Sequence, residues 1–107
     1  MNEQAIEEAL NNQGLNAPRL TPDDIDAVIV NENYHVFENS CMTICCLTLR
    51  NGFNVFGESA CASPLNFDEV IGRKIAKGKA RDKVWELEGY LLKQRLYDES
   101  VKQSGHA

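Results

Sequence analysis

The apolar and polar positions of the N-terminal part follow a helical spacing in two short stretches. Residues 3–11 place their apolar side chains on one side, which predicts a short helix. A second helix is predicted to begin at Thr21, because threonine suits an N-cap and Pro22 suits the first helical position. This helix is expected to end near residues 30–31.

The middle of the chain is rich in β-branched and aromatic residues, which predicts three antiparallel strands. The first strand is expected at residues 34–37, the second at 41–50 and the third at 53–59. Asn51 and Gly52 predict a two-residue hairpin turn between the second and third strands. Both central positions of a type I′ turn need a positive φ, which these two residue types tolerate.

A two-residue turn would pair Arg50 with Phe53 and Leu47 with Phe56. One predicted face of the hairpin then carries Cys45, Leu47, Leu49 and Phe56, and the other carries Ile44, Cys46, Phe53 and Val55, with Arg50 near the turn. A sheet that is packed on one side should show a polar second face. The pattern therefore predicts that both faces of this hairpin are covered.

The last third of the chain predicts a long helix from Phe67 to about Tyr97, with Asn66 as its N-cap and two acids in its first turn. A break in this helix at Gly78 stays open. The helix carries two apolar stripes, made of Phe67, Ile71, Ile75, Trp85, Leu92 and Leu96 on one side and of Ala76, Ala80, Val84, Leu87 and Leu91 on the other. A surface helix of a monomer needs only one stripe, so we expect a homo-oligomer. The alternative is a monomer whose N-terminal helices cover the second faces.

These elements predict an α+β fold with short N-terminal helices, a small three-stranded antiparallel meander and a long C-terminal helix. The 107 residues suit a single domain over residues 1–97, followed by a flexible polar tail over residues 98–107.

Charge is divided unevenly along the chain, which carries −5 in total. Residues 1–69 hold a net charge of −9 and residues 70–107 hold +4. This acidity argues against a nucleic-acid coat and permits a local anion site. A run of basic residues could form such an anion site. It consists of Arg73, Lys74, Lys77, Lys79, Arg81 and Lys83. The run is interpreted either as a solvated helix face or as a contact with a phosphate-bearing ligand or an acidic neighbour.

Catalytic and metal-binding patterns do not emerge from the sequence. The four cysteines form no C-x-x-C pair, and we interpret them as small buried residues of a reducing cytosol. The two histidines, His35 and His106, sit in no Ser/His or Cys/His arrangement. We therefore expect no enzyme, no cofactor and no metal. The polar N-terminus is no signal peptide, and no apolar run approaches the roughly 18 residues of a membrane span.

The region from Asn51 to Leu92 resembles the small bacteriophage family described by its gene-product-49 and gene-product-66 founders. The shared motifs are, in order, N-G-F at 51–53, G-x-S at 57–59, N-F-D at 66–68, I-G at 71–72, alanines at 76 and 80, and W-x-L-E-G-Y-x-L at 85–92. The upstream LTPDDIDAVI also looks like the family, so the resemblance covers about residues 18–96.

The chain is also similar to the Thoeris anti-defence protein one group. Members of that group are oligomeric phage proteins that sequester cyclic nucleotide-type immune signals, including cyclised ADP-ribose, without cleaving them. In that group a phenylalanine on the hairpin and an asparagine before the long helix bind the signal. By resemblance these fall on Phe56 and Asn66. From the residues alone, a core position is favoured for Phe56 over stacking on a base, and Asn66 could cap the helix, pair with a nucleobase edge, or do both.

The group's basic ligand contacts do not transfer residue by residue. Arg50, Arg81 and Lys83 are predicted instead, because they could place positive charge near the same pocket. The resemblance thus implies a homo-oligomer, a dimer or a hexamer, in the host cytoplasm that binds a phosphate-containing small-molecule signal. A module that acts on a host protein is the alternative.

Overall fold

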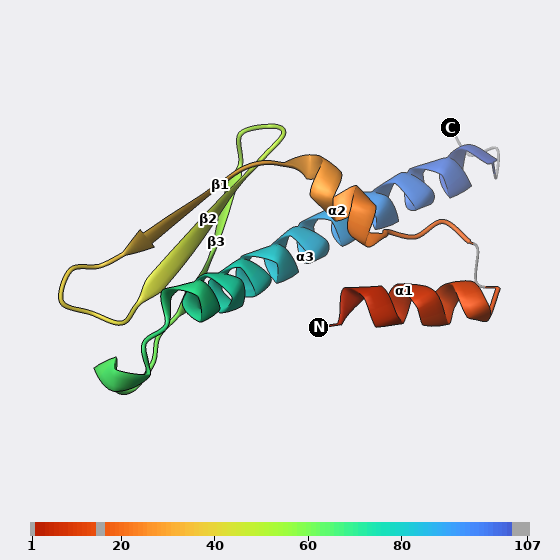
Figure 1. The fold of residues 1–107 in the computed structure, drawn as a ribbon. Helices are drawn as coiled ribbons and strands as arrows, with labels where there is room; N and C mark the ends of the chain where they lie inside the picture. Colours follow the sequence, from red (N-terminus) through yellow and green to blue (C-terminus); the bar gives the residue numbers. More distant parts are fainter. Residues whose placement is uncertain (1, 15–16, 104–107) are drawn as a thin grey trace.

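A three-stranded antiparallel sheet packs on one long helix in the computed structural model, which describes residues 2–14 and 17–103 (Figure 1). The elements are α1 (Glu3–Asn12), α2 (Pro22–Val28), β1 (Ile29–Val36), β2 (Thr43–Leu49), β3 (Asn54–Ser59), the 3₁₀ helix η1 (Pro64–Asn66) and α3 (Glu69–Gln103). The predicted α+β fold class is confirmed. Residues 104–107 of the predicted tail, including His106, lie outside the described residues.

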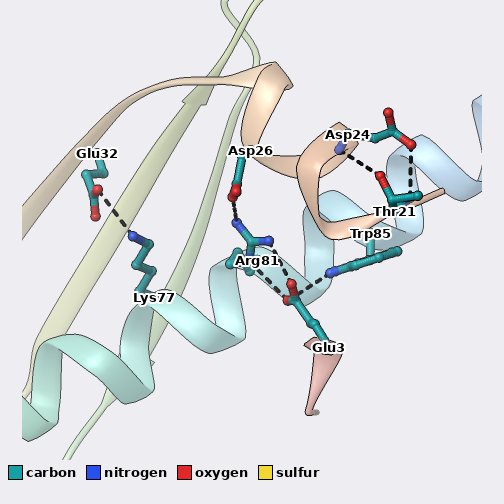
Figure 2. A network of polar contacts seen from close by, with 8 residues as sticks. All are labelled: Glu3, Thr21, Asp24, Asp26, Glu32, Lys77, Arg81 and Trp85. Carbon is teal, nitrogen blue, oxygen red and sulfur yellow. Dashed lines mark hydrogen bonds and ion pairs between the residues drawn. The ribbon is translucent and has the colours of Figure 1, made fainter. Parts of the chain in front are cut away.

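Helix α2 begins where the sequence predicts. Thr21 and Asp24 form a reciprocal capping box, in which the Asp24 amide donates to the Thr21 hydroxyl at 3.2 Å and the Thr21 amide donates to the Asp24 carboxylate at 2.9 Å (Figure 2). The helix ends at Val28, earlier than predicted, and β1 starts at the next residue. The first strand is thus longer than expected, because it pairs along the whole of β2 and so overrides the low strand propensity of its polar residues.

The predicted two-residue turn between β2 and β3 is wrong. The Leu49 amide donates to the Phe53 carbonyl at 2.8 Å, and the Gly52 amide donates to the Leu49 carbonyl at 2.8 Å. Gly52 takes a φ of 89°, whereas Asn51 has no positive φ, which excludes a type I′ turn. The connection is therefore a three-residue loop with glycine in the left-handed position.

The longer loop shifts the register by one residue and moves β3 side chains to the opposite face. Leu47 lies opposite Val55, and Cys46 lies opposite Phe56. The inner face of the hairpin consists of Thr43, Cys45, Leu47, Leu49, Val55 and Gly57, and the outer face consists of Ile44, Cys46, Thr48, Asn54, Phe56 and Glu58. The predicted composition of both faces is corrected accordingly.

Only the inner face is buried within one chain. Leu47 is 0% exposed, whereas Phe56 on the outer face is 55% exposed. Helix α2 packs against α3 and the start of β1, so the N-terminal helices do not cover the outer face as the monomer alternative required. The prediction that both faces are covered is wrong for the single chain.

Helix α3 lies along the inner face with its smallest residues toward the sheet. Gly72, Ala76, Ala80 and Val84 are buried there, which confirms one of the two predicted stripes as the sheet contact. A Cβ atom built on Gly57 would lie 2.3 Å from the Ala76 carbonyl oxygen and 2.4 Å from the Ala80 amide nitrogen. Strand β3 and helix α3 therefore touch through their backbones.

The long helix is continuous and starts later than predicted. It passes through Gly78 without a break and continues to Gln103 rather than ending near Tyr97. Asn66 is not its N-cap. Asp68 is the N-cap, because its carboxylate accepts hydrogen bonds from the amides of Val70 at 2.9 Å and Ile71 at 3.1 Å.

The molecule is elongated, with principal extents of 61 × 33 × 21 Å and a radius of gyration of 17.8 Å. A compact domain of this length has a radius of gyration of about 13 Å. The difference arises because α3 is much longer than the sheet it supports, as Figure 1 shows.

Candidate ligand-binding surface

Phe56 and Lys83 form an aromatic–cation pair at the open side of the sheet. The Lys83 ammonium lies over the Phe56 ring, 4.0 Å from its centroid, and also donates to the Phe56 backbone carbonyl. Strand β3 is an edge strand, so a side chain from α3 can reach around it. The backbone contact at Gly57 brings the helix close enough for this reach. Two of the predicted site residues are thus brought together.

Asn66 lies in a different place, at the end of η1. It lines a pocket of about 100 Å³ between the end of β3 and the start of α3, whose walls include Cys41, Cys61, Asp68 and Ile71. The Ser63 hydroxyl accepts a hydrogen bond from the Leu65 amide at 3.3 Å, which stabilises the turn that carries Asn66. Phe56 does not line this pocket, so one chain does not unite the two residues that the resemblance pairs.

Arg50 sits at the hairpin loop, where its amide donates to the Val28 carbonyl at 2.9 Å. Its side chain lines a pocket of about 230 Å³ together with Arg19 and Arg95. Two acidic residues, Asp24 and Glu88, complete the charged lining. The sequence reasoning missed Arg19 and Arg95 as site residues. The sequence contained a signal for Arg19, because Arg19 and Arg50 are the two basic residues of the otherwise acidic segment 1–69.

Arg81 is engaged by acids from two N-terminal elements (Figure 2). Its guanidinium donates to Glu3 at 2.7 and 3.0 Å and to Asp26 at 2.5 Å, and the Trp85 indole donates to the same Glu3 carboxylate at 3.0 Å. The hydrogen bond with Glu3 raises the pKa of Arg81 further above its usual value. Arg81 and Lys83 are two residues apart, so they leave α3 on nearly opposite sides. The structure therefore does not bring Arg81 beside Phe56.

This cluster ties α1 to α3. No residue of α1 is buried, and Ile6 is 48% exposed, so apolar packing holds α1 only weakly. A helix of ten residues is also marginal by itself. The Glu3 contacts with Arg81 and Trp85 are therefore the main attachment of α1 near its N-terminus.

We expect acid to release α1. The hydrogen bond from Arg81 lowers the pKa of Glu3 below its ordinary value of 4.5, against the opposing effect of burial, and Trp85 adds a second lowering contact. A lowered carboxyl pKa stabilises the folded state above the unfolded pKa, and this contribution is lost as the pH falls through the folded pKa. Since Trp85 is the single tryptophan, its fluorescence should change in a transition centred below pH 4.5.

Glu3→Gln is the control for this transition. The variant should show the acid-state Trp85 fluorescence already at neutral pH and lose the transition. A wild-type signal that stays flat from pH 7 to pH 3 while the sheet remains folded would contradict the role of Glu3.

A second ion-pair network crosses from α3 to β1. Lys77 donates to Glu32 at 3.3 Å (Figure 2). The Tyr34 hydroxyl donates to the other Glu32 oxygen at 2.6 Å. The bond from Tyr34 lowers the pKa of Glu32, and the Lys77 contact acts in the same direction against desolvation. Burial and this bond raise the pKa of Tyr34. These groups support the sheet on the helix and leave Lys77 less available to a ligand.

An exposed apolar groove lies between the hairpin loop and the C-terminal half of α3. It measures about 250 Å³, and its apolar lining consists of Leu49, Phe53, Leu87, Tyr90 and Leu91. Phe53, Tyr90 and Leu91 are each more than half exposed. Soluble monomers rarely expose contiguous apolar surface without a binding role.

Within residues 2–14 and 17–103, no three His, Cys, Asp or Glu side chains are grouped to hold a metal ion. No helix in the same ranges is both long and apolar enough to span a membrane.

The sequence matches the model of a known protein family. The family described as Phage protein (N4 Gp49/phage Sf6 gene 66) family matches residues 20–96. The chain belongs to this phage family. Comparison with curated proteins and with solved structures gave no match. The region shared with the Gp49/gene 66 family spans α2, the whole sheet and most of α3, whereas α1 and its Glu3 contact precede it.

Proposed function

We propose that this protein is a phage accessory protein that binds a phosphate-containing, cyclic nucleotide-type signal of the host and sequesters it without catalysis. The observation that carries the proposal is the exposed Phe56 ring with the Lys83 ammonium over it. A base can stack on an exposed aromatic ring, and an adjacent cation can pair with a phosphate. Membership of a phage family and the resemblance to the Thoeris anti-defence group support the same function.

The ligand pocket is completed by a second copy of the chain in this proposal. The β2–β3 loop, which carries Arg50, and the η1 turn, which carries Asn66, lie at opposite ends of the sheet (Figure 1). At about 3.3 Å per residue, a strand of six residues separates them by roughly 20 Å. Contact of both with one small ligand therefore requires different subunits. The open outer face and the apolar groove of Phe53, Tyr90 and Leu91 offer surfaces for such an assembly.

Binding of cyclic ADP-ribose and of cyclic oligonucleotides tests the proposal. We expect at least one of them to raise the melting temperature, since a ligand that binds only the folded state stabilises it. Heating the complex should then release the ligand with its mass unchanged. A cleaved product would contradict sequestration, and the lack of any thermal shift or calorimetric signal with all of them would reject the proposed function.

Phe56→Ala should weaken that binding by about 5- to 150-fold, because stacking of a base on an aromatic ring contributes roughly 1–3 kcal/mol. The variant should fold normally, since the ring is 55% exposed. Phe37→Ala is a matched control, because Phe37 is 45% exposed and contacts His35 rather than a lysine. Equal losses in both variants, measured by calorimetry, would argue against a specific role for Phe56.

A protein-interaction module is the second candidate function, and the apolar groove favours it. Leu87, Tyr90 and Leu91 present an apolar helix face beside Phe53, which suits a host protein segment as well as a second copy. Tyr90→Asp should then abolish capture of one defined host protein without changing the mass in light scattering. A Tyr90→Asp variant that becomes monomeric instead would assign the groove to self-association.

A further inference from the structure

Cys41 and Cys61 lie on either side of the open end of the β2–β3 hairpin. Cys41 stands two residues before Thr43, the first residue of β2, and Cys61 stands two residues after Ser59, the last residue of β3. Thr43 and Ser59 are paired in the sheet. The paired register ends here, and its extension by two residues would set Cys41 opposite Cys61, with both side chains on the inner face.

The environment of the two thiols agrees with this placement. Both line the same pocket, beside Ile71 and Gly72 of the first turn of α3. The Cys61 side chain is also the first cause of the raised pKa of Cys41, which agrees with two neighbouring thiols. Directly opposed residues of an antiparallel pair have Cα atoms about 4.5–5.5 Å apart, which is within the roughly 4.4–6.8 Å range of disulfides.

The other two cysteines are placed differently. Cys45 is 0% exposed in the core, and burial raises the pKa of its thiol. Cys46 is on the outer face, where its thiol approaches the Asn54 side chain. Cys41 and Cys61 are both partly exposed, so a small reagent can reach them. The four free thiols thus separate into one facing pair and two single residues.

We propose that Cys41 and Cys61 are a modification site, at which the two thiols form a reversible disulfide by exchange with a low-molecular-weight disulfide. The thiolate of one cysteine attacks the external disulfide and releases one thiol, which leaves a mixed disulfide. The second cysteine then attacks that bond and releases the other thiol. The two cysteines lose two electrons and two protons, and the external disulfide is reduced to two thiols.

The bridge would join the two ends of the hairpin beside the pocket that Asn66 lines. It would close a loop over residues 41–61 and so restrict the unfolded chain, which should raise the melting temperature by about 10–15 °C. The neighbouring Cys61 side chain and desolvation raise the pKa of Cys41, so exchange should accelerate as the pH rises. This site does not depend on the proposed ligand.

Oxidised glutathione tests the site on the full-length protein. Intact mass should fall by two hydrogen atoms, and peptide mapping should find Cys41 linked to Cys61. Cys41→Ser and Cys61→Ser should each stop at a mixed adduct with glutathione. Cys46→Ser is the matched control and should form the bridge at the wild-type rate. Adducts without a bridge in the wild type, or a bridge through Cys45 or Cys46, would overturn the proposal.

Phenylarsine oxide gives a second measurement that needs no variant. A trivalent arsenical chelates two thiols that face each other, so the native reduced protein should bind one equivalent and become resistant to bridge formation. No stoichiometric binding to the folded protein would show that the two thiols do not meet, and would reject the site.

Discussion

Gly57→Ala should destabilise the protein by at least about 3 kcal/mol, and it is the smallest substitution from which we expect so large a loss. The added methyl group would meet the Ala76 carbonyl and the Ala80 amide at less than 2.5 Å. Both are backbone atoms of a continuous helix, so no side-chain rotation can relieve the clash. Strand β3 and helix α3 would have to separate, which opens the core along its length.

Gly78→Ala is the matched control for this prediction. Gly78 lies in the same helix but is exposed, and a Cβ built there meets nothing within 4 Å. Removing a glycine from a helix interior should stabilise the protein by about 1 kcal/mol. The two free energies of unfolding, measured with urea, should therefore change in opposite directions. A Gly57→Ala variant as stable as the wild type would show that the helix and the strand are not in backbone contact.

Leu47→Ala should cost about 2–5 kcal/mol, whereas Ile44→Ala on the same strand should cost less than about 1 kcal/mol. Leu47 is 0% exposed on the inner face, and Ile44 is only partly buried on the outer face. The comparison holds at protein concentrations where light scattering gives the mass of one chain. Urea unfolding under those conditions measures both losses. Similar losses for the two variants would mean that the outer face is as deeply buried as the inner face.

Local capping and spacing were sufficient to predict much of the fold. Thr21 and Pro22 marked the start of α2 correctly, because the cap depends on residues only three positions apart. The spacing of Ala76, Ala80 and Val84 likewise predicted one of the two apolar stripes of α3, and the structure shows that this stripe faces the sheet. These features depend on neighbours along the chain or on the period of a single element.

The length of the loop between β2 and β3, and therefore the strand register, could not be predicted from the sequence. Asn51-Gly52 suits a two-residue type I′ turn and also a three-residue loop with glycine in the left-handed position. The structure has the longer loop. With this loop, the Arg50 amide donates to the Val28 carbonyl, and the register of β3 places Gly57 against α3. Both contacts come from distant parts of the chain. A one-residue difference in the loop then decides which face carries Phe56.

The same reason limits prediction of the candidate site. Phe56 and Lys83 meet because β3 is at the sheet edge and its register turns Phe56 outward. Arg81 belongs to the same basic run, yet its partner Glu3 is 78 positions away. Asn66 resembles a helix cap in the sequence, but Asp68 takes that role, since the 3₁₀ turn at Pro64–Asn66 delays the start of the helix. Composition alone cannot separate a ligand contact from a structural ion pair here.

The length of α3, which extends beyond the sheet, has a consequence for hydrodynamic measurements. A chain with a radius of gyration of 17.8 Å and a longest extent of 61 Å experiences more friction than a sphere of its mass. A single copy should therefore elute from a sizing column, and diffuse, like a larger compact protein. A column calibrated with globular standards would assign a monomer an oligomeric mass. Sedimentation equilibrium, which does not depend on shape, can count the subunits.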